Sequence, residues 1–321
     1  MVSMSCTPLQ PRRLDQPCVA ILMCTFNGEQ FLREQLESIA SQSHTNWVLW
    51  VSDDGSSDQT WNILCSMQKA WGQDRVILCR GPRKGFARNF LSLACRADIH
   101  ADYFAFSDQD DIWLPDKLSR ALNMLGKHPD HLALLYGSRT QMVDAKGVPI
   151  GMSKLSPKTL NFSNALVQNV AGGNTMMFNR ALVDIVRFAG QDVNIVSHDW
   201  WLYIVATATQ GKVIFDQTPY ILYRQHKGNI VGSNIGIRPG LKRLRQLFSG
   251  RFKSWIHNNC ACLQHIESKM TSEHVKRARL LSSLHRLGIL KRLTGFFQSG
   301  VRRQSFAGNI ALLAAVVLNQ V

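Results

Sequence analysis

The sequence predicts an α/β fold in which a mostly parallel sheet is covered by helices on both faces. Four apolar segments of strand length follow one another along the first third of the chain, and apolar residues at helical spacing follow each of them. The segments are almost continuously apolar, as is typical of strands that are buried on both faces. They lie at residues 19–24, 47–52, 76–79 and 103–107.

Polar turns follow the first two apolar segments. The first turn contains Thr25 and Asn27, and the second contains Asp53 and Asp54. Asp and Gly also favour tight turns, so the second turn alone is not diagnostic of binding. Parallel sheets bind ligands beyond the carboxyl ends of their strands. We therefore expect these polar side chains to meet at one edge of the sheet.

Three carboxylates follow the fourth segment. Residues 103–107 run directly into Asp108, Asp110 and Asp111. Carboxylates on one turn repel one another, and a divalent cation removes that repulsion. The cluster therefore predicts a metal-bound phosphate site at a strand end. The alternative is a solvated acidic turn in which Asp111 caps the next helix.

The remaining elements are less regular. We expect strands near residues 132–136, 139–144, 174–179, 213–216 and 220–224, and helices from Ala181 and over residues 200–209. Residues 146–165 resemble a loop. Ser56 and Gln59 have the spacing of a capping box at the start of the second helix.

Charge divides the chain of 321 residues. Residues 1–237 carry 22 Lys and Arg against 20 Asp and Glu, whereas residues 238–321 carry 15 against 2. We predict a polar tail at 1–17, an α/β domain at 18–237 and a basic, amphipathic helical region at 238–321. There is no GxGxxG or GxxxxGK[ST] motif, which disfavours Rossmann dinucleotide binding and P-loop chemistry.

The basic region has two interpretations besides nucleic-acid binding. Basic residues alternate with apolar ones around residues 241–251 and 276–284. Such helices fit the anionic inner surface of a membrane, or they pack back on the α/β domain with a solvated face. Nucleic-acid binding through charge alone is a rival, but no nucleic-acid motif accompanies it.

Cysteine usage and hydropathy predict a cytoplasmic protein. The eight cysteines form no CxxC pair, which suggests reduced thiols, and the polar N-terminus has no apolar core of secretory length. The longest apolar run, 310–318, is far shorter than the roughly 20 residues of a spanning helix. We expect contact with the inner face of the membrane to be peripheral.

Five segments together resemble the family 2 glycosyltransferases with a GT-A fold, and particularly the rhamnosyltransferase-like members. In order, they read CTFNGEQFLREQLESIASQS, VSDDGSSD, FSDQDDIWLPDKL, HDWW and YRQHKGNIVG, and the resemblance covers about residues 18–234. Each motif alone is weak, but all five in family order are specific.

The resemblance implies a nucleotide-binding edge. It places the turn of Thr25 and Asn27 at the nucleotide and lets Asp53 or Asp54 accept a hydrogen bond from the base. Asp108 would face the ribose or the metal.

The resemblance also implies a divalent metal, Mg2+ or Mn2+, that bridges the donor diphosphate. Asp110 would be a ligand, and His226 of the RQH pattern a candidate further ligand. Arg224 and Lys227 are candidate diphosphate contacts. The loop after His226 is expected to close over the donor.

The implied reaction is an inverting sugar transfer from a dTDP- or UDP-sugar, with rhamnose as one candidate, to a hydroxyl of a glycan or lipid-linked acceptor. Bacterial surface polysaccharide or lipopolysaccharide synthesis is the expected setting.

Asp199 would be the general base, unless it only caps its helix. Trp200 and Trp201 are candidate sugar contacts or core residues. A metal-dependent nucleotidyl- or phosphotransferase on a similar sheet is the rival enzyme class.

Overall fold

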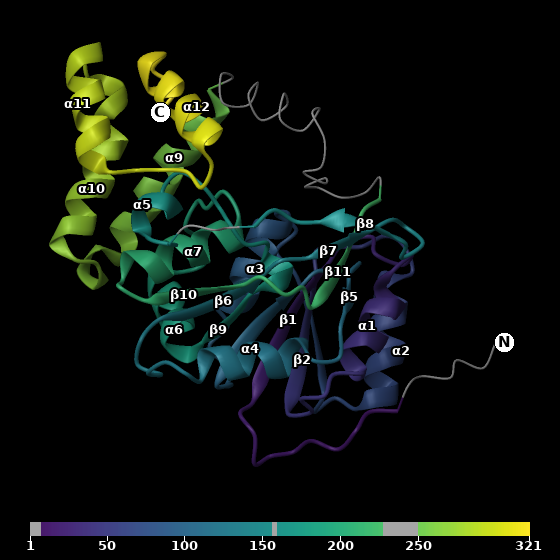
Figure 1. Ribbon diagram of the computed structural model, residues 1–321. Helices are drawn as coiled ribbons and strands as arrows, with labels where there is room; N and C mark the ends of the chain where they lie inside the picture. Colours follow the sequence, from purple (N-terminus) through teal and green to yellow (C-terminus); the bar gives the residue numbers. More distant parts are fainter. Residues whose placement is uncertain (1–7, 156–158, 227–249) are drawn as a thin grey trace.

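A computed structural model describes residues 8–155, 159–226 and 250–321 (Figure 1). Within these ranges the fold is built around a seven-stranded sheet of order β10-β6-β9-β4-β1-β2-β3. β9 runs antiparallel between β4 and β6, and the other strand pairs are parallel, so the predicted sheet is confirmed. The strands are β1 (Val19–Thr25), β2 (Trp47–Asp53), β3 (Val76–Arg80), β4 (Tyr103–Ser107), β6 (Leu134–Ser138), β9 (Met177–Asn179) and β10 (Lys212–Asp216).

Helices cover both faces because successive side chains of each strand point to opposite sides. In β1, Ile21 belongs to the core on one face and Leu22 to the core on the other. The first face packs against α1 (Leu32–Ala40), α2 (Thr60–Trp71) and α4 (Lys117–Leu125). The second face packs against α3 (Phe86–Ala94), α6 (Arg180–Ala189) and α7 (His198–Ala208).

A second sheet among the described residues has four short strands, in the order β5-β11-β7-β8. These are β5 (Ile112–Trp113), β11 (Ile221–Arg224), β7 (Gln141–Val143) and β8 (Pro149–Met152). β11 pairs with β5, which immediately follows the acidic cluster. The small sheet therefore brings the segment before His226 beside the acidic cluster.

Two local predictions were wrong. Residues 146–165 are not only loop, because they contain β8 and the short helix α5 (Phe162–Ala165). β8 is an exposed strand that, within the ranges the structure describes, pairs only with β7, so no buried apolar pattern reveals it. Ser56 does not form a capping box, because α2 begins at Thr60 without a side-chain cap and Ser56 Oγ donates to Asp53 Oδ1 at 2.6 Å.

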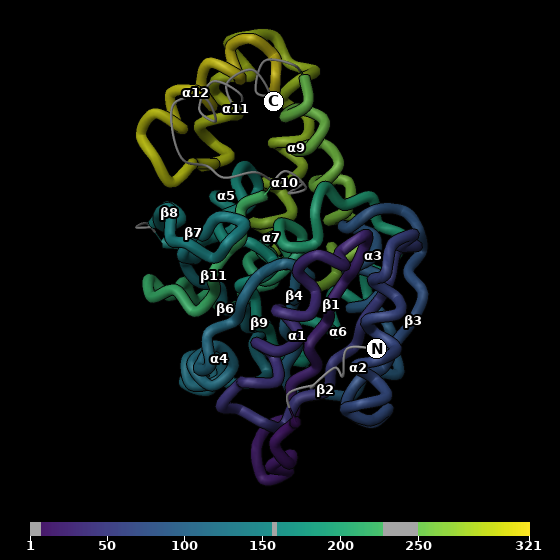
Figure 2. The backbone as a smooth tube through the Cα atoms, turned by 90° about the vertical axis from the view of Figure 1, so that its right-hand side faces the viewer, coloured from purple at the N-terminus to yellow at the C-terminus, as the bar shows by residue number. Residues whose placement is uncertain are grey.

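The C-terminal helices gather at one end of the molecule (Figures 1 and 2). They are α9 (Arg251–Cys262), the 3-10 helix η2 (Leu263–Lys269), α10 (Ser272–Ser283), the 3-10 helix η3 (Leu284–Arg286), α11 (Ile289–Ser299) and α12 (Phe306–Val317). Leu281 and Leu284 are buried in the same core as Trp201 of α7. The stretch at 276–284 thus packs back on the α/β part, and residues 241–248 lie outside the described residues.

The domain boundary between residues 237 and 238 stays a prediction. A search of the described residues finds no helix that is both long and apolar enough to cross a membrane.

Candidate active site

The candidate site lies where β1, β2 and β4 end. The parallel register sets Thr25 beside Asp53 and Met23 beside Ser107, so the turns after these strands open at one edge of the sheet. Asp108 follows the last residue of β4 directly. The predicted meeting of several polar turns at one sheet edge agrees with this topology.

Asp110 and His226 meet although 116 positions separate them in the chain. The distance from His226 Nε2 to Asp110 Oδ2 is 2.8 Å, and both side chains are partly exposed. A carboxylate oxygen and an imidazole nitrogen at this separation form a pair of candidate metal ligands. The described residues contain no group of three or more His, Cys, Asp or Glu arranged to hold a metal, and the assignment of Asp108 to the metal stays a prediction.

The carboxylates carry a concentrated negative charge. Burial, followed by the charges of Asp110 and Asp199, raises the pKa of Asp108 to about 8. Burial, followed by the charges of Asp108 and Asp110, also raises the pKa of Asp111. Burial and mutual repulsion make the ionised forms of these carboxylates unfavourable. A bound cation would stabilise the ionised forms, so the site favours cation binding.

Asp111 does not cap a helix. α4 begins at Lys117 with Asp116 in the N-cap position, so that expectation is corrected. Asp111 is fully buried, and its carboxylate accepts hydrogen bonds from Asn174 Nδ2 at 2.6 Å and from the backbone N–H of Arg224 at 3.3 Å. Asp111 therefore joins the turn after β4 to β11 and to the segment before β9.

Arg224 is a structural residue, which corrects the expectation of a diphosphate contact. The residue is only 2% exposed. Its guanidinium donates to the carbonyl oxygen of Asp110 at 3.1 Å and to that of Ala145 at 2.9 Å, pairs with Glu34, and lies over the ring of Phe31. These contacts occupy the planar fork that would otherwise meet phosphate. Lys227 and the loop expected to close over the donor lie outside the described residues.

Asp53, the last residue of β2, and Asp54, which follows it, hold the neighbouring loops in place through hydrogen bonds. Asp53 is buried, and its carboxylate accepts from Thr25 Oγ1 at 3.0 Å and from Ser56 Oγ at 2.6 Å. Asp54 accepts from the backbone N–H groups of Arg83 at 2.6 Å and Gly85 at 2.8 Å. Asp53 also accepts from the backbone N–H groups of Gly55 and Ser56 and from Arg80, which uses up its lone pairs. The two bonds to Asp54 leave acceptor capacity for a nucleobase.

Asn27 also organises the edge. Its φ of 47° is left-handed, which Asn tolerates better than most residues, and its Oδ1 accepts from the backbone N–H of Ser57 at 2.9 Å. Thr25 and Asn27 thus tie the β1 turn to the β2 turn. Their predicted contact with a nucleotide stays a prediction.

Asp199 lies in the first turn of α7. The N-cap of this helix is Ser197, so Asp199 does not have the capping role considered as the alternative. Its Oδ2 accepts from Asn169 Nδ2 at 2.9 Å and its Oδ1 from the backbone N–H of Trp200 at 2.7 Å. Its neighbour His198 meets Phe106 of β4 edge-on with ring centroids 4.8 Å apart, so the start of α7 lies beside the strand that leads into Asp108.

His198 anchors this turn in an aromatic pocket. The imidazole stacks on Phe90 with ring centroids 4.0 Å apart and meets Phe106 edge-on. It is buried, and both ring nitrogens lack a hydrogen-bond partner among the described residues. Burial lowers the pKa of His198 to about 4, an effect only partly opposed by Asp199. The ring is therefore neutral near pH 7.

Trp200 and Trp201 belong to the core, which corrects the expectation of a sugar contact. Trp201 is 0% exposed, and Trp200 Nε1 donates to the carbonyl oxygen of Ala165 at 2.6 Å. Trp200 also meets Trp255 of α9 edge-on. The two indoles join α7 to its neighbours instead of lining a pocket.

The structure adds residues that sequence reasoning missed. Gln109, the middle residue of the acidic motif, accepts from the backbone N–H of Phe26 at 2.9 Å and donates to its carbonyl at 3.0 Å. Arg80 pairs with Asp53 at 3.4 Å, and the exposed Arg83 side chain lies beside Gly55. The closely spaced basic residues of the segment RGPRKG, residues 80–85, were the sequence signal that could have indicated Arg80 and Arg83.

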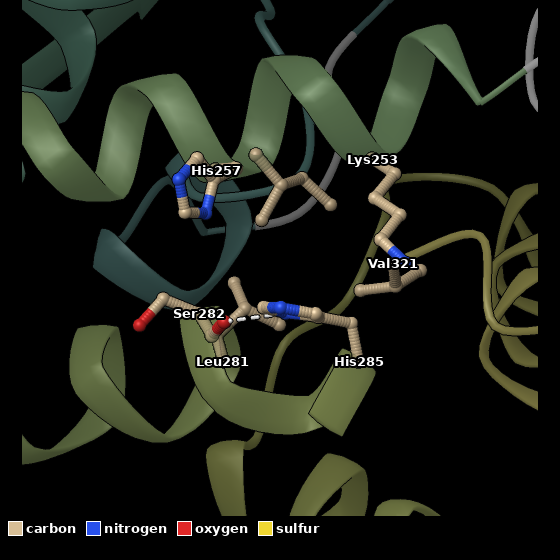
Figure 3. Close-up of a pocket in the computed structure, with 7 residues that line it drawn as sticks. Lys253, His257, Leu281, Ser282, His285 and Val321 are labelled. Carbon is tan, nitrogen blue, oxygen red and sulfur yellow. Dashed lines mark hydrogen bonds between the residues drawn. The ribbon is translucent and has the colours of Figure 1, made fainter. Parts of the chain in front are cut away.

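A separate cavity of about 230 Å³ lies in the C-terminal helices (Figure 3). Its lining comes from α9, α10, η3 and the end of the chain, and includes Lys253, His257 and His285. None of the predicted site residues lines it. The cavity is therefore distinct from the acidic site.

The fold gathers acidic turns at the carboxyl ends of parallel strands, where sheets of this kind bind their ligands. The chain belongs to glycosyl transferase family 2, whose model matches residues 20–187. It is 33% identical over 230 residues to the dTDP-rhamnosyl transferase RfbG of Shigella flexneri, a match that covers 69% of this chain and 78% of that protein. This confirms the predicted family and its rhamnosyltransferase-like character.

A second relative is the UDP-Glc:alpha-D-GlcNAc-diphosphoundecaprenol beta-1,3-glucosyltransferase WfgD of Escherichia coli. It is 25% identical over 176 residues, which are 54% of this chain and 65% of that protein. The protein is thus a glycosyltransferase, and the name of this second relative includes a diphosphoundecaprenol-linked sugar.

Two solved structures share the fold. S. aureus TarS 1–349 in complex with UDP-GlcNAc has a TM-score of 0.53 at 15% identity and covers 88% of this chain and 92% of that one. The mannosyltransferase PcManGT from Pyrobaculum calidifontis, in complex with GDP-Man and Mn2+, has a TM-score of 0.52 at 16% identity and covers 97% and 89%. The GT-A fold prediction is confirmed.

Proposed function

We propose that this glycosyltransferase moves a sugar from a nucleoside diphosphate donor to an acceptor hydroxyl with inversion and with a divalent metal. The observation that carries the proposal is that two distant segments converge on the turn after β4. His226 meets Asp110 at 2.8 Å, and His198, the neighbour of Asp199, meets Phe106 of β4 edge-on with ring centroids 4.8 Å apart. This convergence supports a site in which metal ligands and a base act together.

The donor set suits a hard divalent cation. Asp110 and His226 offer one oxygen and one nitrogen ligand, and the remaining positions would go to diphosphate oxygens and water. When bound, the cation supplies positive charge where charge develops on the leaving diphosphate. Asp108 would bind the ribose or support the cation, and either Mg2+ or Mn2+ is compatible.

Asp199 is the proposed general base. The acceptor oxygen forms a bond to the anomeric carbon while the bond from that carbon to the diphosphate oxygen breaks. The acceptor proton goes to the Asp199 carboxylate, and the nucleoside diphosphate leaves. The amide of Asn169, at 2.9 Å, would orient this carboxylate. A positioned base contributes about 10²- to 10⁴-fold in rate.

Arg80 and Arg83 are the proposed basic contacts for the donor. Asp53 and Asp54 hold the loop that carries them, and Arg83 is exposed beside the turn that would read the base. Thr25 and Asn27 would shape the nucleotide pocket. A dTDP-sugar is the first donor to try because of the similarity to RfbG, and UDP-sugars are the alternative.

The acceptor we propose is a glycan or a lipid-linked glycan used in bacterial surface polysaccharide or lipopolysaccharide synthesis. A lipid-linked acceptor would place the enzyme in the cytoplasm, at the inner face of the membrane. This setting is supported by the diphosphoundecaprenol-linked sugar in the name of the relative WfgD.

The test begins with a panel of sugar nucleotides, incubated with Mn2+, Mg2+ or EDTA. We expect thermal stabilisation by one donor and metal-dependent release of nucleoside diphosphate. Release of pyrophosphate would identify a nucleotidyltransferase instead. Asp110→Ala should abolish metal-dependent turnover. Asp199→Asn should reduce transfer by about 10²- to 10⁴-fold while donor binding persists.

Asp184→Asn is the matched control, because Asp184 is a largely exposed carboxylate on α6 outside the site. Full transfer activity in Asp199→Asn would remove Asp199 as the base. Normal metal binding by Asp110→Ala would remove Asp110 as a ligand.

A further inference from the structure

Large exposed apolar side chains gather around α11 and α12. Their exposed fractions range from 40% at Val317 to 80% at Phe306. Soluble proteins expose such side chains singly, and a concentration of them marks an interaction surface. We call this set the apolar ridge: Ile289, Leu290, Phe297, Phe306, Ile310, Val317 and Leu318.

Helical spacing arranges the ridge in stripes. Phe306, Ile310 and Val317 lie four and seven residues apart, so they share one side of α12. The other side of α12 packs into the core through Leu312 and Val316. On α11, Leu290 and Phe297 are likewise seven residues apart.

The two helices lie against each other. Arg292 near the start of α11 donates to the carbonyl of Val317 at the end of α12, at 3.4 Å. Both helices occupy the same end of the molecule in two perpendicular views (Figures 1 and 2). The ridge residues therefore lie on two helices that contact each other.

Positive charge borders the ridge. Residues 250–321 contain 11 Lys and Arg against 2 Asp and Glu, and no acidic residue follows Glu273. Arg286, Lys291 and Arg302 are exposed next to the ridge residues in the chain. An apolar face with a cationic border is complementary to an anionic lipid surface, where acyl chains and headgroups offer both chemistries.

We propose that the apolar ridge inserts into the surface of an anionic lipid bilayer, with Arg286, Lys291 and Arg302 at the headgroups. α12 has 12 residues and is about 18 Å long, which suits a helix lying in the interfacial layer. A second copy of the chain is the less suitable occupant, because it would bring the same excess of positive charge to the contact.

Attachment of α11 and α12 to a lipid surface would orient the active site relative to that surface. Asn164 of α5 accepts a hydrogen bond from Tyr203 of α7 at 2.8 Å and donates to the carbonyl of Arg302 at 2.9 Å. The backbone N–H of Gln304 donates to Gln168 Oε1 at 2.8 Å. The lipid-binding end is thus fixed to the elements next to Asp199. A membrane-borne acceptor would therefore approach the active site from the side of Asp199, the proposed general base. This orientation rests on the proposed function, whereas lipid binding does not.

The test is flotation of the full-length protein with vesicles. We expect binding to vesicles of equal parts phosphatidylglycerol and phosphatidylcholine, and weaker binding to phosphatidylcholine alone or at high salt. The double variant Leu290→Ser with Phe306→Ser should lower the partition coefficient by about tenfold or more. Phe188→Ser is the matched control, since Phe188 is 56% exposed on α6, and it should bind vesicles as the wild type does.

Two outcomes would overturn the proposal. One is equal vesicle binding by the wild type and the ridge variant. The other is a dimer in sedimentation that the ridge variant dissociates while vesicle binding is unchanged, which would assign the ridge to a second copy. Metal-dependent hydrolysis of a soluble donor should be the same in the ridge variant as in the wild type, so failure of lipid binding and failure of the proposed function are distinguishable.

Hydrogen exchange with bound vesicles tests the orientation. Amides of residues 286–318 should exchange more slowly on lipid binding, whereas those of α2 and β3 should not change. Protection of α2 and β3 instead would contradict the orientation.

Discussion

At the scale of single residues, the site depends on groups whose neighbours in space come from distant parts of the chain. The sequence motif around Asp108 and Asp110 was sufficient to locate the acidic cluster. The sequence was not sufficient to assign the role of Arg224. This residue lies two positions before His226, and its place in the motif suggested a phosphate contact. Arg224 is buried at the end of β11. Its role is decided instead by four hydrogen-bonding partners that lie more than 70 positions away in the chain.

Arg224→Met should lower both stability and metal affinity. The substitution keeps an apolar stem but removes the donors that satisfy the carbonyls of Asp110 and Ala145. We expect a loss of about 1–3 kcal/mol in the free energy of unfolding, because buried acceptors would be left unpaired. Denaturant unfolding and Mn2+ titration measure the two effects. Arg83→Met should leave stability unchanged and weaken donor binding, and the same behaviour in Arg224→Met would restore Arg224 as a diphosphate contact.

His198 should make stability depend on pH. Its folded-state pKa of about 4 lies below the unfolded value of about 6.5. Between these values the unfolded chain binds more protons, so stability present above pH 6.5 is lost as the pH falls toward 4. The full loss attributable to this group is about 3 kcal/mol.

Denaturant unfolding from pH 7 to pH 4 checks this effect. His198→Asn cannot titrate, so its stability should fall less than that of the wild type, and the two curves should converge at low pH. His131→Asn, at an exposed position, should follow the wild type. Parallel curves for His198→Asn and the wild type would contradict the neutral, buried imidazole.

At the scale of elements, the short 3-10 helix η1 (Gly173–Thr175) packs closely against the start of α7, where Gly173 leaves room for the His198 ring. A Cβ on Gly173 would lie 2.3 Å from His198 Nε2, well inside contact distance. Gly173→Ala should therefore displace His198 and, with it, Asp199. We expect a loss of about 1–3 kcal/mol in the free energy of unfolding and a lower kcat. Donor KM should change little, because the nucleotide turns follow β1 and β2.

Gly288→Ala is the matched control for this substitution, since no atom lies within 4 Å of its Cβ position and its φ of −61° suits any residue. The double variant Gly173→Ala with His198→Ala makes room for the new methyl group. It should lose less stability than the two single changes added together. Additive losses would show that η1 and α7 do not meet in this way.

Element prediction succeeded where a pattern was long and buried. The first four strands matched their apolar runs closely, because burial on both faces imposes a continuous signal. The second sheet was not foreseen, since β5 has two residues and β8 is an exposed strand. Its pairing depends on tertiary contacts that local sequence does not encode. The contact between Asp110 and His226 rests on that pairing, so only the family resemblance suggested it.

At the scale of the whole molecule, the α/β part and the C-terminal helices share one hydrophobic core. Phe252, Ile256 and Leu281 belong to the same cluster as Trp201 and Val205 of α7. The acid-balanced and the basic parts of the described chain therefore share buried apolar contacts. Net charge reports on solubility and partners, whereas the extent of a folding unit is set by buried apolar contact.

This shared core predicts that residues 1–249 cannot keep the native packing alone. Removing α9 to α12 would expose Trp200 to water where Trp255 now covers it, and would leave Asn164 without its bond to the carbonyl of Arg302. The full chain should unfold in one cooperative calorimetric transition. The truncated chain should bind an apolar dye and lose its near-ultraviolet circular dichroism while helical signal persists. Two separate transitions in the full chain, with a truncated form that keeps donor binding, would instead establish the α/β part as an independent domain.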